Sequence, residues 1–209
     1  MAKVFLCQVS SRGLVLSHRA LFPEQTLNQE VLMRHLILAS VFLLPSLGFA
    51  AGSSDPTPPT PTNTTTECQE GMIWDEKTSA CVAPQESLLD DETLYNAARE
   101  FAYAGQYNNA LVALSAMTDP LDDRVLTYKG FAHRKAGDVD LGMAYYQQAI
   151  ARNPDNLLAR SYMGQAFVEQ GNMSAAKSEL VQIVQRGGRG GWPAFSLRSA
   201  IRNGAGYSY

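Results

Sequence analysis

Histidine and cysteine are scarce in this sequence, with three of each among 209 residues. Metal centres and many catalytic centres are built from clusters of these side chains, and neither a G-x-S-x-G nor an H-E-x-x-H pattern is present. Basic residues do not outnumber acidic ones, 17 against 20, so nothing favours nucleic-acid binding. The longest apolar stretch, residues 36–49, includes Pro45 and is shorter than the roughly 20 residues of a membrane span. We therefore predict no catalytic residue, no cofactor, no metal site and no nucleic-acid partner.

What is present begins with an export signal. Residues 33–50 start with Met33 and Arg34, continue through the apolar stretch and end in small residues suited to cleavage after Ala50. A signal peptide is predicted here, and residues 1–32 are interpreted as an upstream extension from a start codon assigned too early. The alternative is an uncleaved signal anchor with a long lead. The expected location is periplasmic or extracellular, with no stable membrane span after cleavage.

Two cysteines remain after such a cleavage, together with 13 basic and 18 acidic residues, a net charge of −5. Cys68 and Cys81 are expected to pair, because two cysteines in an exported chain form a disulfide by default. Residues 51–66 are a proline- and threonine-rich linker with no large apolar side chain. Such a composition cannot bury a core, so we expect an extended, semi-stiff spacer.

Residues 67–83 are predicted to form a small hairpin, because a turn follows the short strand-like run "MIW" between the two cysteines. Over about fifteen residues this stretch resembles the opening of peritrophin-type chitin-binding modules, in Cys68, Gly71, Trp74 and Cys81. Those modules have six cysteines. The resemblance makes contact with a glycan an alternative to a purely structural disulfide clip.

From Leu88 onward the sequence has helical periodicity and repeats itself. Gly137 and Gly171 lie 34 residues apart, and Gly105 marks a first, shorter unit. Three units are in register when their frames start at Asp91, Asp123 and Leu157. Their eighth and twentieth positions are small: Ala98, Gly130 and Gly164, then Ala110, Gly142 and Ala176. Their eleventh and twenty-fourth positions are large: Phe101, His133 and Phe167, then Leu114, Tyr146 and Leu180. Small residues let two helices approach closely, and the large ones fill the grooves between them. These units resemble tetratricopeptide repeats.

The resemblance implies an all-α fold. We expect a short solenoid over residues 88–203, with helix-turn-helix repeats at 91–122, 123–156 and 157–190 and a capping helix at 192–203, preceded by the disulfide-closed hairpin. His133 is the only histidine after residue 50, and it is expected to pack between helices. The terminal "GAGYSY" is expected to fray, with docking onto the cap as the alternative.

In this family the first helices of the repeats line a groove that binds partner proteins or peptides. Carried over by position, the predicted groove residues are Tyr95, Asn96, Arg99, Tyr103, Arg124, Thr127, Tyr128, Phe131, Arg134, Lys135, Tyr162 and Gln165, with Ser161 and Glu169 beside them. Arg99, Arg124, Arg134 and Lys135 would form a cationic patch next to aromatic faces, suited to an extended peptide with acidic groups. The predicted function is a non-enzymatic, exported protein-interaction adaptor. The alternative is a cell-wall protein whose hairpin contacts polysaccharide while the repeats recruit a partner.

Overall fold

The structure is a computed structural model that describes residues 56–85 and 88–208. All of them belong to one compact unit, Gly52–Tyr209. The predicted signal peptide, the upstream extension and residues 51–55 of the linker lie outside the described residues. No helix in the described part of the chain combines the length and the apolar character that crossing a bilayer requires.

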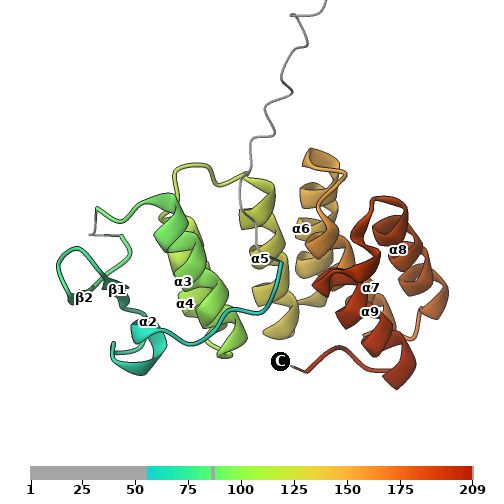
Figure 1. Cartoon of the computed structure of the whole chain (residues 1–209), viewed down its shortest axis with the longest axis horizontal. Helices are drawn as coiled ribbons and strands as arrows, with labels where there is room; N and C mark the ends of the chain where they lie inside the picture. The colour runs from blue at the N-terminus through green and yellow to red at the C-terminus, as the bar shows by residue number, and fades with distance from the viewer. Residues whose placement is uncertain (1–55, 86–87, 209) are drawn as a thin grey trace, which may run out of the picture. The chain divides into compact units, whose positions relative to one another are not determined.

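Helices joined in pairs make up most of the described chain (Figure 1). The first helices of the pairs are α3 (Asp91–Tyr103), α5 (Asp123–Lys135) and α7 (Leu157–Glu169), and the second helices are α4 (Tyr107–Ser115), α6 (Val139–Arg152) and α8 (Met173–Gln185). A 3-10 turn, η1 (Gly188–Gly190), leads into a last helix, α9 (Trp192–Asn203), which packs on both α7 and α8. The predicted fold class, a helical array with a capping helix behind a small hairpin, is confirmed.

Short polar side chains begin most of these helices. Asp90 and Asp122 accept hydrogen bonds from the backbone N–H groups of Thr93 and Arg124, at the starts of α3 and α5. Asn156 caps α7 in the same way. Such caps satisfy donors that have no partner inside the helix. The acidic clusters before the helices therefore have a structural role at these positions.

Glycine ends the first helix of each pair. Gly137 has φ +102°, and the bonds from its N–H to Arg134 O and from Asp138 N–H to His133 O close the end of α5. Gly105 and Gly171 have the same left-handed backbone after α3 and α7. Only glycine adopts this conformation without steric cost, so the regular spacing of these glycines sets the spacing of the turns.

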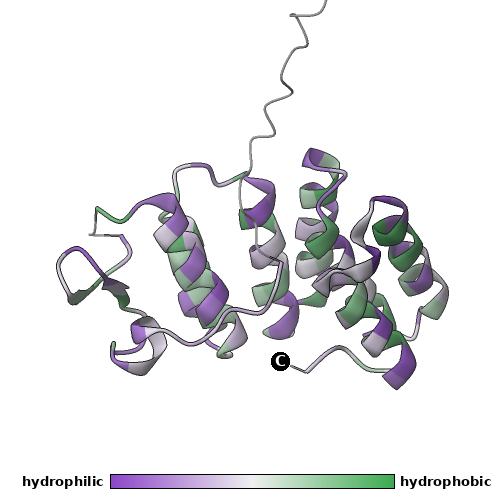
Figure 2. Cartoon of the chain, in the orientation of Figure 1, coloured by the Kyte–Doolittle hydropathy of each residue, from purple (hydrophilic) through white to green (hydrophobic). Residues whose placement is uncertain are grey.

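The two helices of the second repeat approach closely at a pair of glycines. A Cβ atom added to Gly142 would lie 2.8 Å from Gly130 O and 2.9 Å from Arg134 Cβ, and one added to Gly130 would lie 2.6 Å from the ring of Tyr146. In the third repeat, Gly164 instead receives Leu197 of α9, 2.7 Å from where its Cβ would stand. Figure 2 shows hydrophobic and hydrophilic residues alternating along the helices, as expected for elements with one buried side.

The segment ahead of the array forms a small covalently closed structure. Strands β1 (Ile73–Asp75) and β2 (Ala80–Val82) pair antiparallel, with Trp74 opposite Cys81. The predicted Cys68–Cys81 disulfide is present, with sulfur atoms 2.05 Å apart. A short helix, α2 (Asn63–Thr66), precedes the hairpin and contacts both β1 and α3.

Two expectations about the ends of the unit need correction. Residues 56–66 are not a free spacer, because they lie against the first repeat and end in α2. The described residues after α9, up to residue 208, do not fray: the ring of Tyr207 packs 5.2 Å from that of Trp192, and Tyr207 N–H donates to Gln165 Oε1. Docking onto the cap, the alternative, is what the structure shows.

Candidate functional site

The predicted aromatic groove residues form a cluster that links the three repeats. The ring of Phe131 is stacked 5.5 Å from that of Tyr103 and lies 4.9 Å from that of Tyr162. The hydroxyls of Tyr103 and Tyr162 are 2.7 Å apart and join α3 to α7. Tyr128 is fully buried and meets Tyr95 edge to face at 5.6 Å. Each such ring pair contributes about 0.5–1.5 kcal/mol beyond the area it buries, so the cluster stabilises the array itself.

Burial also affects the acidity of this cluster. It raises the pKa of Tyr95, Tyr128 and Tyr103 above the ordinary value for a phenol. These hydroxyl groups, like ordinary phenols, are neutral at physiological pH, and the raised pKa makes their ionisation still less favourable.

The predicted cationic patch is not an open surface, because two of its four members, Arg99 and Arg134, are buried inside the unit. Arg99 is 7% exposed, and its Nε lies 3.4 Å from the hydroxyl of Tyr128. Arg124 is half-buried, pairs with Glu92 at 3.0 Å and places its guanidinium 4.7 Å from the centre of the Tyr95 ring.

The other two members of the patch lie at the end of α5. The Arg134 side chain is completely buried, and its Nη1 is 2.8 Å from both carboxylate oxygens of Glu169, while its Nε donates to Tyr146 Oη. Although burial opposes its charge, Tyr146 and Glu169 together raise the pKa of Arg134. Lys135 is half-buried, and burial followed by the nearby Arg134 lowers its pKa. Arg134 thus ties α5, α6 and α7 together and is not available to a partner.

Of the remaining predicted groove residues, Thr127 and Gln165 are buried and Asn96 is exposed. Thr127 is 1% exposed and accepts a hydrogen bond from Asn156 at the joint between the second and third repeats. Gln165 is fully buried beside Ser196 of α9, so the capping helix closes the third repeat where a groove was predicted. Asn96 is exposed on α3.

A proline-rich stretch of the same chain covers part of the surface that α3, α5 and α7 share. We call residues 56–62 the proline segment and this surface the first-helix face. The segment runs extended from the neighbourhood of α5 to α2 (Figure 1). Arg99 Nη2 donates to the carbonyl oxygen of Thr57 at 2.6 Å. The contact uses the main chain of the segment, which any extended peptide also presents.

Glu100 fastens the end of the proline segment. Thr62 donates its backbone N–H and its hydroxyl to the Glu100 carboxylate, at 2.8 and 2.6 Å. The backbone N–H and the hydroxyl of Thr65 donate to the same carboxylate. Glu100 is 6% exposed, and a buried carboxylate requires such hydrogen bonds.

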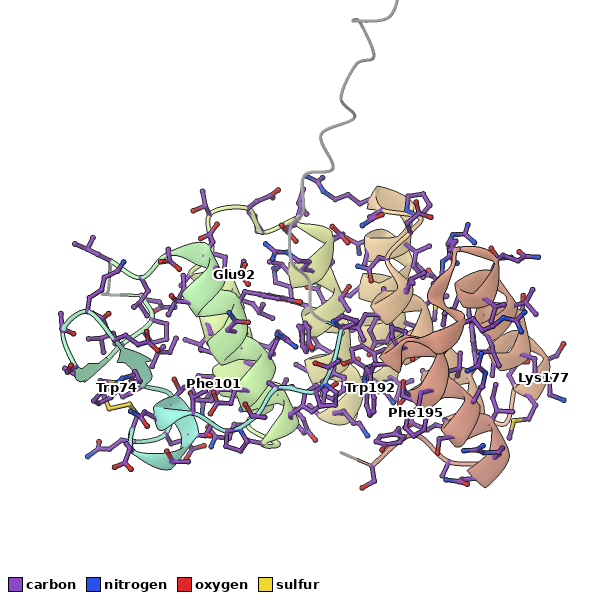
Figure 3. All side chains as sticks on the ribbon, in the orientation of Figure 1. Trp74, Glu92, Phe101, Lys177, Trp192 and Phe195 are labelled. Carbon is purple, nitrogen blue, oxygen red and sulfur yellow. A yellow bond between two sulfur atoms is a disulfide. The ribbon has the colours of Figure 1, made fainter. Side chains whose placement is uncertain are left out.

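Three cavities border the proline segment. The largest is 810 Å³ and lies between the segment, the hairpin and α3, with Pro59, Trp74 and Asn96 in its lining. The second is 350 Å³, and its lining includes three prolines of the segment, the end of α3 and aromatic residues from the C-terminal part of the chain: Pro58, Pro59, Pro61, Tyr103, Trp192 and Tyr207. The third is 240 Å³ and lies between Pro56, Tyr95, Leu158 and Pro193. In Figure 3, Trp192 stands beside the segment with Phe195 next to it. The segment therefore covers the face without filling it.

Two features outside this face were also candidates. Trp74 of the hairpin is half-buried, and its backbone N–H donates to Thr64 Oγ1. Glycan contact by the hairpin stays a prediction. His133 is half-buried and stacks on Tyr145 at 5.5 Å, between α5 and α6. Within the described ranges, no three His, Cys, Asp or Glu residues are grouped as a metal site would require.

The residue patterns of the sequence did not identify Glu100, Trp192 and Tyr207 as contacts of the proline segment. Glu100 stands among alanines and aromatic residues in "AAREFAYAG", and an acid within the apolar part of a helix was a usable signal of a buried partner. Trp192 and Tyr207 were assigned to the cap and the frayed end. Their approach to the segment depends on contacts over more than 100 residues, which no local pattern records.

The comparisons with known proteins concern the second half of the array. A family model described as "Tetratricopeptide repeat" matches residues 133–189. No curated protein and no solved structure matches the chain. The matched residues run from the end of α5 through α8 and into η1.

Proposed function

The chain is a tetratricopeptide repeat protein, and on that premise we propose that it is a non-enzymatic adaptor that binds an extended peptide of a partner protein along the first-helix face. Repeats of this family generally have a protein-interaction role. One observation carries the proposal: an extended stretch of polypeptide already lies on this face, bound through its main chain by Arg99.

The exposed side of α3 supports the same conclusion. Asn96 is exposed next to Arg99 and its Oδ1 accepts from Arg99 Nη1 at 3.2 Å, so the buried guanidinium is held in position. A donor fixed in this way costs little entropy when it meets a peptide carbonyl. A peptide that ran along α3 would lie within reach of both side chains.

We also propose that the protein acts outside the cytoplasm. The Cys68–Cys81 disulfide supports this, since such bonds persist in oxidising compartments. The basic and apolar stretch at residues 33–50 supports it from the sequence.

Photo-crosslinking in the native cell tests the adaptor proposal. A photo-reactive phenylalanine derivative is placed at Asn96 in the full chain, and at the exposed Lys177 on α8 as the matched control (Figure 3). We expect a defined protein adduct from position 96 that position 177 does not produce. Equal adducts at both positions, or none at position 96 in cells that express the chain, would contradict binding on the first-helix face.

A further inference from the structure

The proline segment has the properties of a ligand. Its sequence is PTPPTPT, and Figure 2 shows that it has no strongly hydrophobic residues. The segment therefore buries little apolar surface in the core. Thr57, Thr60 and Pro61 are exposed, and Pro56, Pro58 and Pro59 are half-buried. Consecutive prolines hold a chain extended before it binds, and so little conformational entropy is lost on docking.

The surface under the segment has the matching properties of a receptor for such peptides. Proline rings of extended segments dock onto aromatic side chains, with donors nearby for the free carbonyl oxygens. Here Tyr103, Trp192 and Tyr207 supply the aromatic side of the 350 Å³ cavity, and Arg99 supplies the donor. Tyr207 is held there by its contact with the ring of Trp192, so α3, α9 and the chain end build one wall together.

The fit between the two is incomplete. Cavities of 810, 350 and 240 Å³ remain beside the segment. A peptide of similar backbone with a larger apolar side chain at one of these places would make contacts that the proline rings do not make. A partner can therefore bind this surface more tightly than the chain's own segment.

We propose that the first-helix face recognises a proline-rich, extended segment of another protein, and that residues 56–61 occupy this site in the same chain until the partner segment displaces them. The inference rests on the proposed adaptor function and names its ligand class. Thr62 and α2 stay fastened to Glu100 when residues 56–61 leave, so the displaced segment remains tethered and can return.

The tether has a measurable consequence. A segment joined directly to its site competes at an effective concentration of the order of millimolar, so a free peptide of the same sequence binds the unaltered chain weakly. If substitutions weaken the docking of the segment, the fraction of open sites rises, and the apparent dissociation constant of the free peptide, which is inversely proportional to that fraction, falls.

The test uses a fluorescent peptide with the sequence PTPPTPT and the full chain, with anisotropy as the readout. One variant carries Pro58→Gly, Pro59→Gly and Pro61→Gly, which remove the rings and leave Thr57, Thr62 and Thr65 in place. The matched control is Thr60→Gly, an exposed change in the same segment. We expect the proline variant to bind the peptide about tenfold more tightly or better, and the control to bind like the unaltered chain. Adding Trp192→Leu to the proline variant should remove this gain.

Circular dichroism first establishes that each variant keeps its helix content. A folded proline variant that binds the peptide no better than the unaltered chain overturns the inference. If position 96 still crosslinks to a partner in that case, the adaptor function stands and only the ligand class is wrong. A stable complex between the proline variant and the unaltered chain, seen by sedimentation, would assign the site to a second copy of this chain and would also overturn a proline-rich partner.

Discussion

Glu100 shows how a single side chain can decide what lies on a surface. Its carboxylate receives both N–H and hydroxyl groups from Thr62 and from Thr65, and these bonds hold α2 against α3. Periodicity predicts the side of a helix on which a residue stands. It does not predict what covers that side, and for this reason Arg99 and Arg134 were assigned to an open groove although both are buried.

Replacing Glu100 with alanine is expected to loosen this attachment. The donors of Thr62 and Thr65 lose their shared acceptor, and we expect the free energy of unfolding to fall by about 1–3 kcal/mol. Hydrogen exchange of the Thr62 and Thr65 amides should accelerate, while the Thr93 amide, which donates to Asp90, serves as the internal control. Glu100→Gln should have a smaller effect, because its amide oxygen still accepts. Unchanged exchange at Thr62 in Glu100→Ala would mean that the carboxylate does not hold the segment.

The helix pairs are the part of the molecule that local pattern predicts best. Gly105, Gly137 and Gly171 end helices through their own backbone conformation, and Gly130 and Gly142 permit a contact between neighbours in sequence. These causes act within one repeat, so they can be found in the order of the residues. The burial of Gln165 by α9 depends on a contact with Ser196, about 30 residues away in the sequence. Hydrogen bonds of this kind produce no periodic pattern in the sequence.

Gly142→Ala tests the close approach of α5 and α6. Helix propensity alone favours alanine over glycine by about 1 kcal/mol. The added Cβ would lie 2.8 Å from Gly130 O, so both backbones must shift, and we expect a net loss of about 1–2 kcal/mol. The measurement is urea unfolding followed by circular dichroism. Gly190→Ala is the matched control, since nothing lies within 4 Å of its Cβ, and a gain in stability for Gly142→Ala would contradict the tight packing.

Spacer, hairpin and array were expected to follow one another as separate parts, yet the described residues of all three are in contact. Arg99 binds Thr57, and α2 touches both β1 and α3. Composition was a poor guide here for a physical reason. A segment without apolar residues cannot build a core of its own, but it can be ordered by a surface that another part of the chain has already built.

Mass spectrometry of the protein recovered from outside the cytoplasm tests the export proposal. Cleavage after Ala50 predicts a mature chain that begins at Ala51, with Cys68 and Cys81 joined and therefore unreactive to alkylation before reduction. A recovered chain that still contains residues 1–50 would exclude cleavage. Free thiols at both cysteines would place the protein in a reducing compartment.

The order of synthesis gives the proline segment a further consequence. A chain is made from its amino end, so residues 56–62 exist before the helices that bind them. When the helices of this compact unit fold, the surface that α3 and α5 share meets a tethered stretch of peptide at once. We expect that the first-helix face is never empty for long, and that any partner binds only after the proline segment has already docked there.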